Sequence, residues 1–296
     1  MRAIRELGSA IFIRIGAALY VGAFMWSPAW AGQPLPWQIT FQQPASPIME
    51  DVVALNDYLL IVIAAVACFV LGLLGFVMWR FNAHRNPIPE TWSHNTPLEI
   101  LWTVVPILIL MTLAVPSFRL LYRQDHIPPA DLTIKVEGHQ WYWSYTYPDF
   151  DIAFDSTMVE ADQLRADQPR LLTADAPVVV PVGRVVRVQL TADDVIHSWA
   201  VPALGVRTDT VPGRLNETWF EVKTPGVYYG YCAELCGARH AYMPVVVEAV
   251  SQEKFEAWIA EHKVAVVPAE KKASLSLRTG LSTSSPVVAS LLSLGS

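Results

Sequence analysis

The sequence is short of charged residues, of cysteine and of basic charge. Only 16% of its 296 residues are charged and 53% are hydrophobic, whereas about 25% of the residues in soluble domains are charged. This composition excludes an intrinsically disordered chain, which needs high charge and low hydrophobicity. Three cysteines are too few for a scaffold held together by disulfides. The net charge of −6 argues against general binding to nucleic-acid phosphates, so we expect no nucleic-acid partner.

What the sequence does contain is hydrophobic runs, and the first of them indicates an export signal. Three arginines precede an apolar stretch over residues 15–26, and the motif Ala29-Trp30-Ala31 follows it. A basic start, a short apolar core and an A-x-A motif are the parts of a signal peptide. A first membrane helix is the alternative, but a span needs about 20 apolar residues. We therefore expect residues 1–31 to be a signal peptide and the mature chain to begin outside the cytoplasm.

Two further uncharged runs predict a two-helix transmembrane hairpin over residues 52–123. Residues 58–79 and 100–118 are long enough to cross the hydrocarbon of a bilayer. The short loop between them carries arginine and histidine, which favours a cytoplasmic position for this loop. Together with the export signal, this orientation places both termini and the chain after about residue 123 outside. Residues 32–51 then form an exported N-terminal segment.

The start of the second run contains a helix-capping pattern. Thr96, Pro97 and Glu99 stand where a capping box has its N-cap, its first helical residue and its third helical residue. Helix capping is therefore one interpretation of Glu99. A functional role for its carboxylate is compatible with that interpretation.

Residues 124–263 have the pattern of an exported all-β domain. Apolar and polar residues alternate with a period of two, for example over residues 186–191, and Pro-Gly pairs separate such segments. The pattern predicts an antiparallel β-sandwich, with a short helix around residues 255–259. The chain after residue 263 lacks periodicity, and we expect residues 264–296 to be a disordered or processed tail.

One segment of this domain has a high density of metal-ligand side chains. Two thiols, an imidazole and a thioether fall within twelve residues, supplied by Cys232, Cys236, His240 and Met243. Because the loops at one end of a β-sandwich converge, His197 at the end of an earlier strand is able to join them. Soft sulfur ligands favour copper among the common metals.

Four kinds of site compete for these residues. A disulfide between Cys232 and Cys236 suits an oxidising compartment. A zinc site would use both cysteines and both histidines but would leave Met243 without a role. A mononuclear blue-copper site needs only one thiolate, so the second cysteine would be surplus. Two copper ions bridged by two thiolates would use all five side chains, and a rigid bridged pair suits electron transfer.

The segment over residues 138–147 is the second unusual feature. Strand alternation places four aromatic side chains on one face: Trp141, Trp143, Tyr145 and Tyr147. Sheet core is the ordinary meaning of such a face, whereas a tryptophan left at the surface would mark a partner. Residues 131–262 also carry 19 acids against 10 bases. This excess would steer a basic partner toward the domain.

The metal-ligand segment, His197, the aromatic segment and the hairpin together resemble subunit II of haem-copper cytochrome c oxidase, of the bacterial aa3-like type. The resemblance covers about residues 42–262. It implies a cupredoxin-like β-sandwich behind a membrane anchor, and an electron-input subunit of an oxidase that reduces oxygen and pumps protons in subunit I. The implied partners are subunit I, other oxidase subunits, cytochrome c and the lipid bilayer. The export signal suggests the inner membrane of a Gram-negative bacterium, with the copper domain in the periplasm.

The resemblance also implies a dinuclear copper A centre. In this centre Cys232 and Cys236 would bridge two copper ions. His197 and His240 would each bind one ion, and Met243 would be a weak ligand.

Further roles follow from the same resemblance. Glu234 would bind copper through its backbone carbonyl and a magnesium ion, shared with subunit I, through its carboxylate. Trp141 would be the residue through which electrons arrive, under a docking patch for cytochrome c that includes Asp193 and Asp194. Glu99 would stand at the mouth of a proton channel into subunit I.

Two features compare this sequence with the varieties of this subunit. Thr146 stands where some relatives carry an acid, so the composition of the docking patch departs from theirs. No Cys-x-x-Cys-His motif is present, which excludes the variety of this subunit that carries a fused haem domain. A quinol oxidase subunit would lack the thiols and imidazoles, and a tethered copper chaperone would show a thioredoxin-like βαβ pattern rather than an all-β domain.

Overall fold

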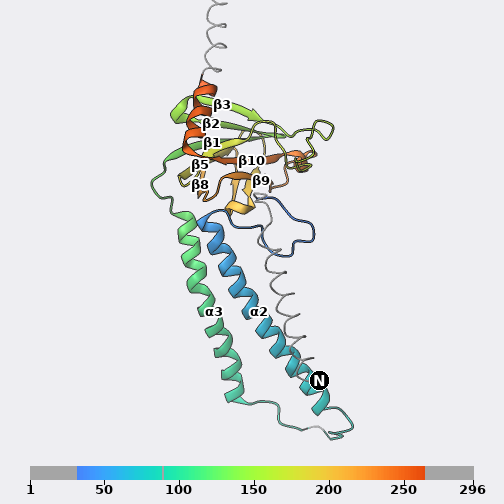
Figure 1. Cartoon of the computed structure of the whole chain (residues 1–296). Coiled ribbons are helices and arrows are strands. Elements are labelled where there is room, and N and C mark those ends of the chain that lie inside the picture. Colours follow the sequence, from blue (N-terminus) through green and yellow to red (C-terminus); the bar gives the residue numbers. More distant parts are fainter. Residues whose placement is uncertain (1–31, 89, 264–296) are drawn as a thin grey trace, which may run out of the picture.

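The structure, a computed structural model, describes residues 32–88 and 90–263. The expected signal peptide, 1–31, and the expected tail, 264–296, lie outside these residues. The described chain consists of two long helices followed by a β-domain, and the helices project from one side of that domain (Figure 1).

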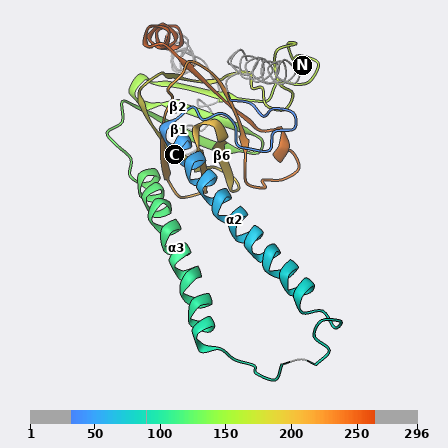
Figure 2. The ribbon, with the colours of Figure 1, turned by 60° about the horizontal axis from the view of Figure 1, so that its bottom comes forward.

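The two helices form the predicted membrane anchor. Helix α2 (Pro47–Arg80) and helix α3 (Thr96–Asp125) are long and apolar enough to cross a membrane. Their apolar side chains are exposed along almost the whole length, as expected of surfaces that face lipid or other membrane helices. Both views show the helices side by side, closest next to the β-domain and diverging toward the connecting loop (Figures 1 and 2).

Helix α2 begins inside the β-domain rather than below it. Its N-cap is Ser46, whose hydroxyl oxygen accepts a hydrogen bond from the backbone N–H of Met49 at 3.0 Å. The same hydroxyl donates to the carbonyl of Leu204 at 2.7 Å, and the N–H of Ala45 donates to the carbonyl of Ala203 at 2.8 Å. Ser46 is fully buried, so the cap of the helix is also a contact of the domain.

A second set of contacts joins the domain to the ends of both helices. The indole N–H of Trp219 donates to the carbonyl of Arg123 in α3 at 3.3 Å. Lys223 forms an ion pair with Glu50 in the first turn of α2 at 2.5 Å. The anchor is therefore attached to the domain at the adjacent ends of both helices.

The predicted cap of the second helix is wrong by one residue. The N-cap of α3 is Asn95, whose side-chain oxygen accepts from the N–H of Leu98 at 3.2 Å. Asparagine is among the best N-cap residues, so it takes the position that we expected Thr96 to occupy. Glu99 nevertheless acts in capping, because its carboxylate accepts from the N–H of Asn95 at 3.4 Å.

The β-domain is a sandwich of two five-stranded sheets. The first sheet has the order β3-β2-β1-β5-β8, and the second has the order β4-β10-β9-β6-β7. The strand bounds are β1 (Leu132–His139), β2 (Tyr142–Tyr147), β3 (Ile152–Ser156), β4 (Val178–Pro181), β5 (Val185–Ala192), β6 (His197–Val201), β7 (Val206–Thr210), β8 (Asn216–Glu221), β9 (Gly226–Cys232) and β10 (Pro244–Val250).

The alternation seen in the sequence is the basis of the core. In β5 the side chains of Val186, Val188 and Leu190 are buried between the sheets, and the intervening residues are partly exposed. The expectation of a purely antiparallel sandwich is wrong, because β1 pairs with β5, and β4 with β10, in parallel. Alternation indicates a half-buried strand, but it carries no information on the direction of the neighbouring strand.

The aromatic segment is a hairpin rather than one strand. β1 ends at His139 and β2 begins at Tyr142, so Gln140 and Trp141 form the turn between them. Three of the four predicted aromatic residues, those of β2, lie in the core: Trp143, Tyr145 and Tyr147. The expectation that Trp141 shares their strand face is wrong, because the chain reverses direction there. Trp141 is half-buried at the rim of the sandwich.

Candidate metal centre

The fold places the predicted metal ligands at one end of the second sheet. His197 is the first residue of β6 and Cys232 is the last residue of β9. These two strands are antiparallel neighbours, with Trp199 opposite Cys232. The loop that leads from β9 to β10 carries Cys236 and His240. The convergence predicted from the sequence therefore occurs.

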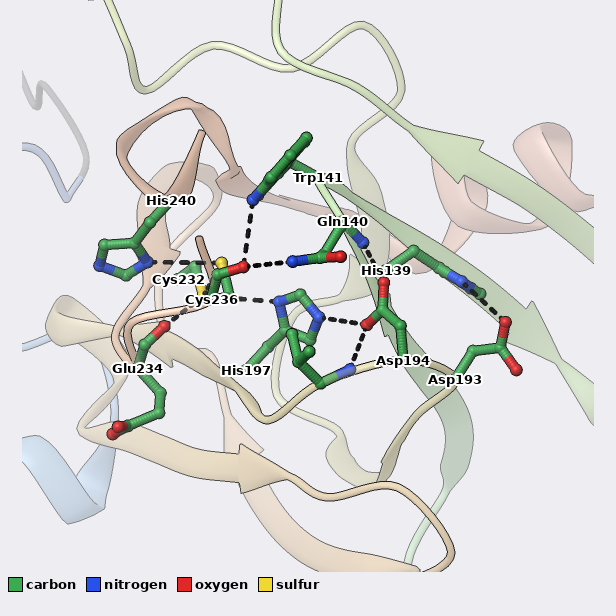
Figure 3. A network of polar contacts seen from close by, with 11 residues as sticks. His139, Gln140, Trp141, Asp193, Asp194, His197, Cys232, Glu234, Cys236 and His240 are labelled. Atoms are coloured by element: carbon green, nitrogen blue, oxygen red, sulfur yellow. Dashed lines mark hydrogen bonds and ion pairs between the residues drawn. The ribbon is translucent and has the colours of Figure 1, made fainter. Parts of the chain in front are cut away.

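The ligand atoms lie close enough to share metal ions (Figure 3). The sulfur atoms of Cys232 and Cys236 are 3.9 Å apart. The Nδ1 atom of His197 is 4.0 Å from the sulfur of Cys232, and the Nδ1 atom of His240 is 3.6 Å from the sulfur of Cys236. His197 and both cysteines are buried, and both thiols are free.

Two further residues predicted as ligands have backbone contacts with Cys232. The backbone carbonyl of Glu234 is 3.3 Å from the sulfur of Cys232, while its carboxylate points away from the cluster (Figure 3). Met243 is buried, and its carbonyl accepts a hydrogen bond from the N–H of Cys232 at 3.0 Å. Carbonyl and carboxylate of Glu234 thus face different surroundings, as two separate roles would require.

The surroundings treat the two thiols differently. Burial opposes ionisation of Cys232, but hydrogen bonds from His197 and from neighbouring backbone groups outweigh it and lower the pKa of this thiol to about 7. Burial and the nearby charge of Cys232 raise the pKa of Cys236 to about 12. The thiolate of Cys232 therefore forms readily, and its negative charge opposes ionisation of Cys236. A pair of thiolates at this distance needs positive charge between or beside them, which a cationic metal provides.

Asp194 holds the imidazole of His197 in place. Its Oδ1 atom is 2.8 Å from Nε2 of His197, so that Nδ1 faces Cys232. A carboxylate on the far nitrogen is the usual partner of a metal-binding histidine. Burial works against the charge of Asp194, but hydrogen bonds from His197 and from the N–H groups of Val195 and Gln140 lower its pKa. Burial likewise opposes protonation of His197, while its bonds to Cys232 and Asp194 raise its pKa overall.

The neighbouring acid, Asp193, has a different environment. Its side chain is 73% exposed, and its Oδ2 atom lies 3.9 Å from Nδ1 of His139. His139 in turn stacks on Tyr142, with ring centroids 4.6 Å apart. Of the two acids predicted for a docking patch, Asp194 contacts a predicted metal ligand, and Asp193 contacts none within residues 32–88 and 90–263.

Trp141 contacts the cysteine loop directly. Its indole N–H donates to the carbonyl of Cys236 at 3.3 Å, and the side-chain amide of Gln140 donates to the same carbonyl at 2.7 Å (Figure 3). The next residue, Gly237, has a φ of +119°. A Cβ atom there would lie 3.0 Å from Nε2 of Gln140 and 3.2 Å from the ring of Trp141. Glycine allows both the backbone conformation and this close approach.

Gln140 is a residue that sequence reasoning missed. Its backbone N–H donates to Asp194 at 2.6 Å while its side chain reaches Cys236, so it links the histidine loop with the cysteine loop. No residue pattern marks a side chain that bonds a carbonyl 96 positions away. Its place directly before Trp141 is the sole signal, and that signal requires knowledge of the turn.

Glu99 is not part of this cluster. It lies in the first turn of α3, at the end of the hairpin far from the β-domain (Figure 1). Any role of Glu99 is therefore separate from metal binding.

Comparison with known proteins gives the same picture for both parts of the chain. Residues 132–250 match the family model for the periplasmic domain of cytochrome c oxidase subunit II, and residues 34–120 match the model for its transmembrane domain. These matches confirm the predicted fold class, a two-helix transmembrane hairpin followed by a cupredoxin-like β-sandwich.

Individual relatives match over most of their length. The probable cytochrome c oxidase subunit 2 of Rickettsia felis is 52% identical, over 88% of this chain and 85% of that protein. Cytochrome c oxidase subunit 2 of Cereibacter sphaeroides is 44% identical, over 78% of this chain and 82% of that protein.

A solved structure is similar to the β-domain. The periplasmic domain of subunit II of cytochrome oxidase from Bradyrhizobium japonicum is 51% identical, with a TM-score of 0.45, over 47% of this chain and 99% of that domain. From the family matches and the length of the alignments with relatives, the chain belongs to the cytochrome c oxidase subunit II family, whose members are subunits of the haem-copper oxidase complex.

Proposed function

We propose that this chain is the electron-input subunit of its oxidase. It accepts electrons from cytochrome c at a dinuclear copper A centre and passes them to haem in subunit I, where oxygen reduction is coupled to proton pumping. Bound copper would supply a reversible one-electron couple at this site. The observation that carries the proposal is the convergence of two free, buried thiols with two imidazole nitrogens 3.6 and 4.0 Å from them.

The donor set fits two copper ions better than one zinc ion. Cys232 and Cys236 would bridge the ions as thiolates, and the Nδ1 atoms of His197 and His240 would each bind one ion. Met243 and the carbonyl of Glu234, both next to Cys232, would complete the set as weak ligands. A tetrahedral zinc site would leave these two donors without a role. Burial of the ligands keeps their positions fixed, which keeps the structural change on electron transfer small.

The residues around the cluster would guide the electron donor. Trp141 reaches the carbonyl of Cys236 from the half-buried rim of the sandwich, so it would connect the surface with a bridging ligand. The excess of acids in the domain would attract a basic cytochrome c. Asp193 and Asp194 lie beside the cluster, and Asp193 is the more exposed.

The remaining proposed roles concern protons, magnesium and location. Glu99 would admit protons to a channel in subunit I in addition to capping α3. The carboxylate of Glu234, which points away from the thiols (Figure 3), would bind magnesium at the contact with subunit I. The protein would be anchored in the bacterial inner membrane after cleavage of residues 1–31. Both termini and the copper domain would lie on the periplasmic side, as the basic loop between the helices favours.

Metal analysis and electron paramagnetic resonance of the purified oxidase test the copper proposal. We expect two copper ions in this subunit and an unpaired electron coupled to two copper nuclei. Cys236→Ser should abolish that shared coupling, because one thiolate cannot form a double bridge. Cys68→Ser serves as the matched control, because Cys68 lies on the exposed surface of α2, far from the cluster. Coupling to one copper nucleus would show a mononuclear site, and zinc without copper would reject electron transfer here.

A further inference from the structure

A cleft lies between the two helices at their ends next to the β-domain, outside everything assigned above. Its volume is about 360 Å³. The residues on which the argument rests come from both helices: Asp51, Leu55 and Tyr58 from α2, and Arg119, Leu120 and Arg123 from α3. We refer to it as the interfacial cleft.

The position of the cleft along the helices matches the boundary of the bilayer hydrocarbon. Tyr58 opens the uncharged run over residues 58–79, and Arg119 directly follows the uncharged run over residues 100–118. At 1.5 Å per residue the first run spans about 33 Å, close to the ~30 Å of a hydrocarbon core. The cleft therefore lies at the depth of lipid headgroups, in the leaflet on the side of the β-domain.

The charges in the cleft leave one cation in excess. Arg123 forms an ion pair with Asp51, and both side chains are partly exposed. Arg119 has no hydrogen bond or ion pair with any residue in the described ranges 32–88 and 90–263. Asp51 is the single acid of the cleft, and Arg123 already engages it. An incoming group with a negative charge is thus favoured, while a cationic group would find no free acid.

The rest of the lining is apolar and suits the upper part of a lipid chain. Leu55 and Leu120 contribute aliphatic surface. The hydroxyl of Tyr58 donates to the hydroxyl of Thr112 at 3.0 Å, and Tyr58 is among the exposed large hydrophobic residues of α2. Charged and apolar side chains line the cleft together, which suits an amphiphile, whereas a small free anion would use only the arginines.

We propose that the interfacial cleft binds the headgroup phosphate of an anionic phospholipid, with Arg119 as the principal donor and Arg123 as the second. A guanidinium group can give two parallel N–H bonds to phosphate oxygens, which a single ammonium group cannot. The lipid is anionic rather than zwitterionic because choline or ethanolamine would bring a cation that the cleft cannot pair. This binding depends only on the membrane anchor, so it stands or falls independently of the copper proposal.

Lipid binding to the purified, delipidated oxidase tests this site. Phosphatidylglycerol and phosphatidylcholine are added separately, and the bound lipids are counted by native mass spectrometry. We expect Arg119→Gln to weaken the binding of one phosphatidylglycerol about tenfold, as loss of a charge-assisted bond predicts. Phosphatidylcholine binding should not change. Arg85→Gln, in the loop at the other end of the hairpin, is the matched control and should leave both lipids unaffected.

Two further variants test the same site, and only Asp51→Asn should strengthen the binding of phosphatidylglycerol. Asp51→Asn frees Arg123 from its ion pair, so phosphatidylglycerol should bind more tightly than in the wild type. Arg119→Lys keeps the charge but loses the paired geometry, and it should retain binding to within severalfold. If the Arg119→Gln protein fails to assemble, the Arg119→Lys protein still allows lipid binding to be measured.

Three results would overturn the proposal. Equal effects of Arg119→Gln on both lipids would show that no anionic headgroup is selected. Displacement of the lipid by inorganic phosphate at equal concentration would show a site for a free anion. Weakened association with subunit I at unchanged lipid count would show that an acidic side chain of a neighbouring subunit fills the cleft.

Discussion

Replacement of Asp194 by asparagine tests the assignment of this residue to His197. The carboxylate accepts three hydrogen bonds, from Nε2 of His197 at 2.8 Å and from the N–H groups of Val195 and Gln140 at 2.6 Å each. Asparagine keeps one acceptor oxygen and replaces the other with a donor. One of these three N–H groups must then face an N–H of the new side chain.

The magnitude follows from the type of bond and its exposure. A hydrogen bond to a charged group contributes about 1.5–3 kcal/mol, which corresponds to about 10- to 150-fold in an equilibrium constant. The side chain of Asp194 is 31% exposed, so water replaces part of the loss and the lower end applies. Loss of a partner that orients a metal-binding histidine typically costs 10- to 100-fold in metal affinity. We therefore expect Asp194→Asn to weaken copper binding about tenfold.

Competition with a copper chelator of known affinity measures this change, and Asp193→Asn is the matched control. The side chain of Asp193 is 73% exposed and makes no contact with a proposed ligand in the described part of the chain. Its replacement should leave copper affinity unchanged but raise the KM for cytochrome c and reduce the dependence of KM on ionic strength, since exposed charges act within a Debye length of about 8–10 Å. An Asp194→Asn protein with copper affinity within twofold of the wild type would refute the reasoning, as would equal losses in both variants.

Three further predictions concern electron transfer and protons. Trp141→Phe keeps a ring but removes the donor to Cys236, so electron transfer from saturating cytochrome c should slow at least severalfold with copper absorption intact. Stopped-flow spectroscopy measures the rate, and a normal rate would contradict this prediction. Met243→Leu should retain both copper ions but shift the potential in a redox titration, because a weak thioether tunes a site rather than holding it; loss of copper would be the contrary result. Glu99→Gln retains a carbonyl oxygen that can accept from the N–H of Asn95, so the helix should stay intact. Oxygen consumption should slow while electron input stays fast, and normal turnover would exclude the proton-channel role.

The sequence predicts the centre of this site well, because soft ligands are rare and their pattern is specific. Cys232 at the end of β9 is close in sequence to Cys236 and His240 in the loop that follows, so local spacing alone brings them together. His197 could be added because strand ends meet at one end of a sandwich. The structure brings all four to one place.

What surrounds the ligands could not be predicted in the same way. The hydrogen bond from Gln140 to Cys236 joins segments that are 96 residues apart, and periodicity describes only near neighbours. The turn at Trp141 was missed because aromatic alternation continues through it and hides the reversal. The cap at Asn95 was missed because Thr96 fits the same motif one residue later, and both side chains are good N-caps.

The sequence also did not show which of two neighbouring acids contacts the cluster. Asp193 and Asp194 are identical neighbours in the sequence, yet one faces water and the other faces an imidazole. Successive side chains point to different sides of the chain, so two adjacent acids seldom share one environment. Only the structure separates the exposed acid from the acid that contacts a proposed metal ligand.

The buried cap at Ser46 has a consequence for the whole anchor. Because the N-cap of α2 is buried in the domain, no linker separates this helix from the sandwich in the described part of the chain. Each residue added after Ser46 would lift the domain by about 1.5 Å and turn it by about 100° relative to the helix. The donor and acceptor of an electron must stay at a fixed separation for a steady rate. The helix thus fixes both the height and the orientation of the sandwich above the bilayer.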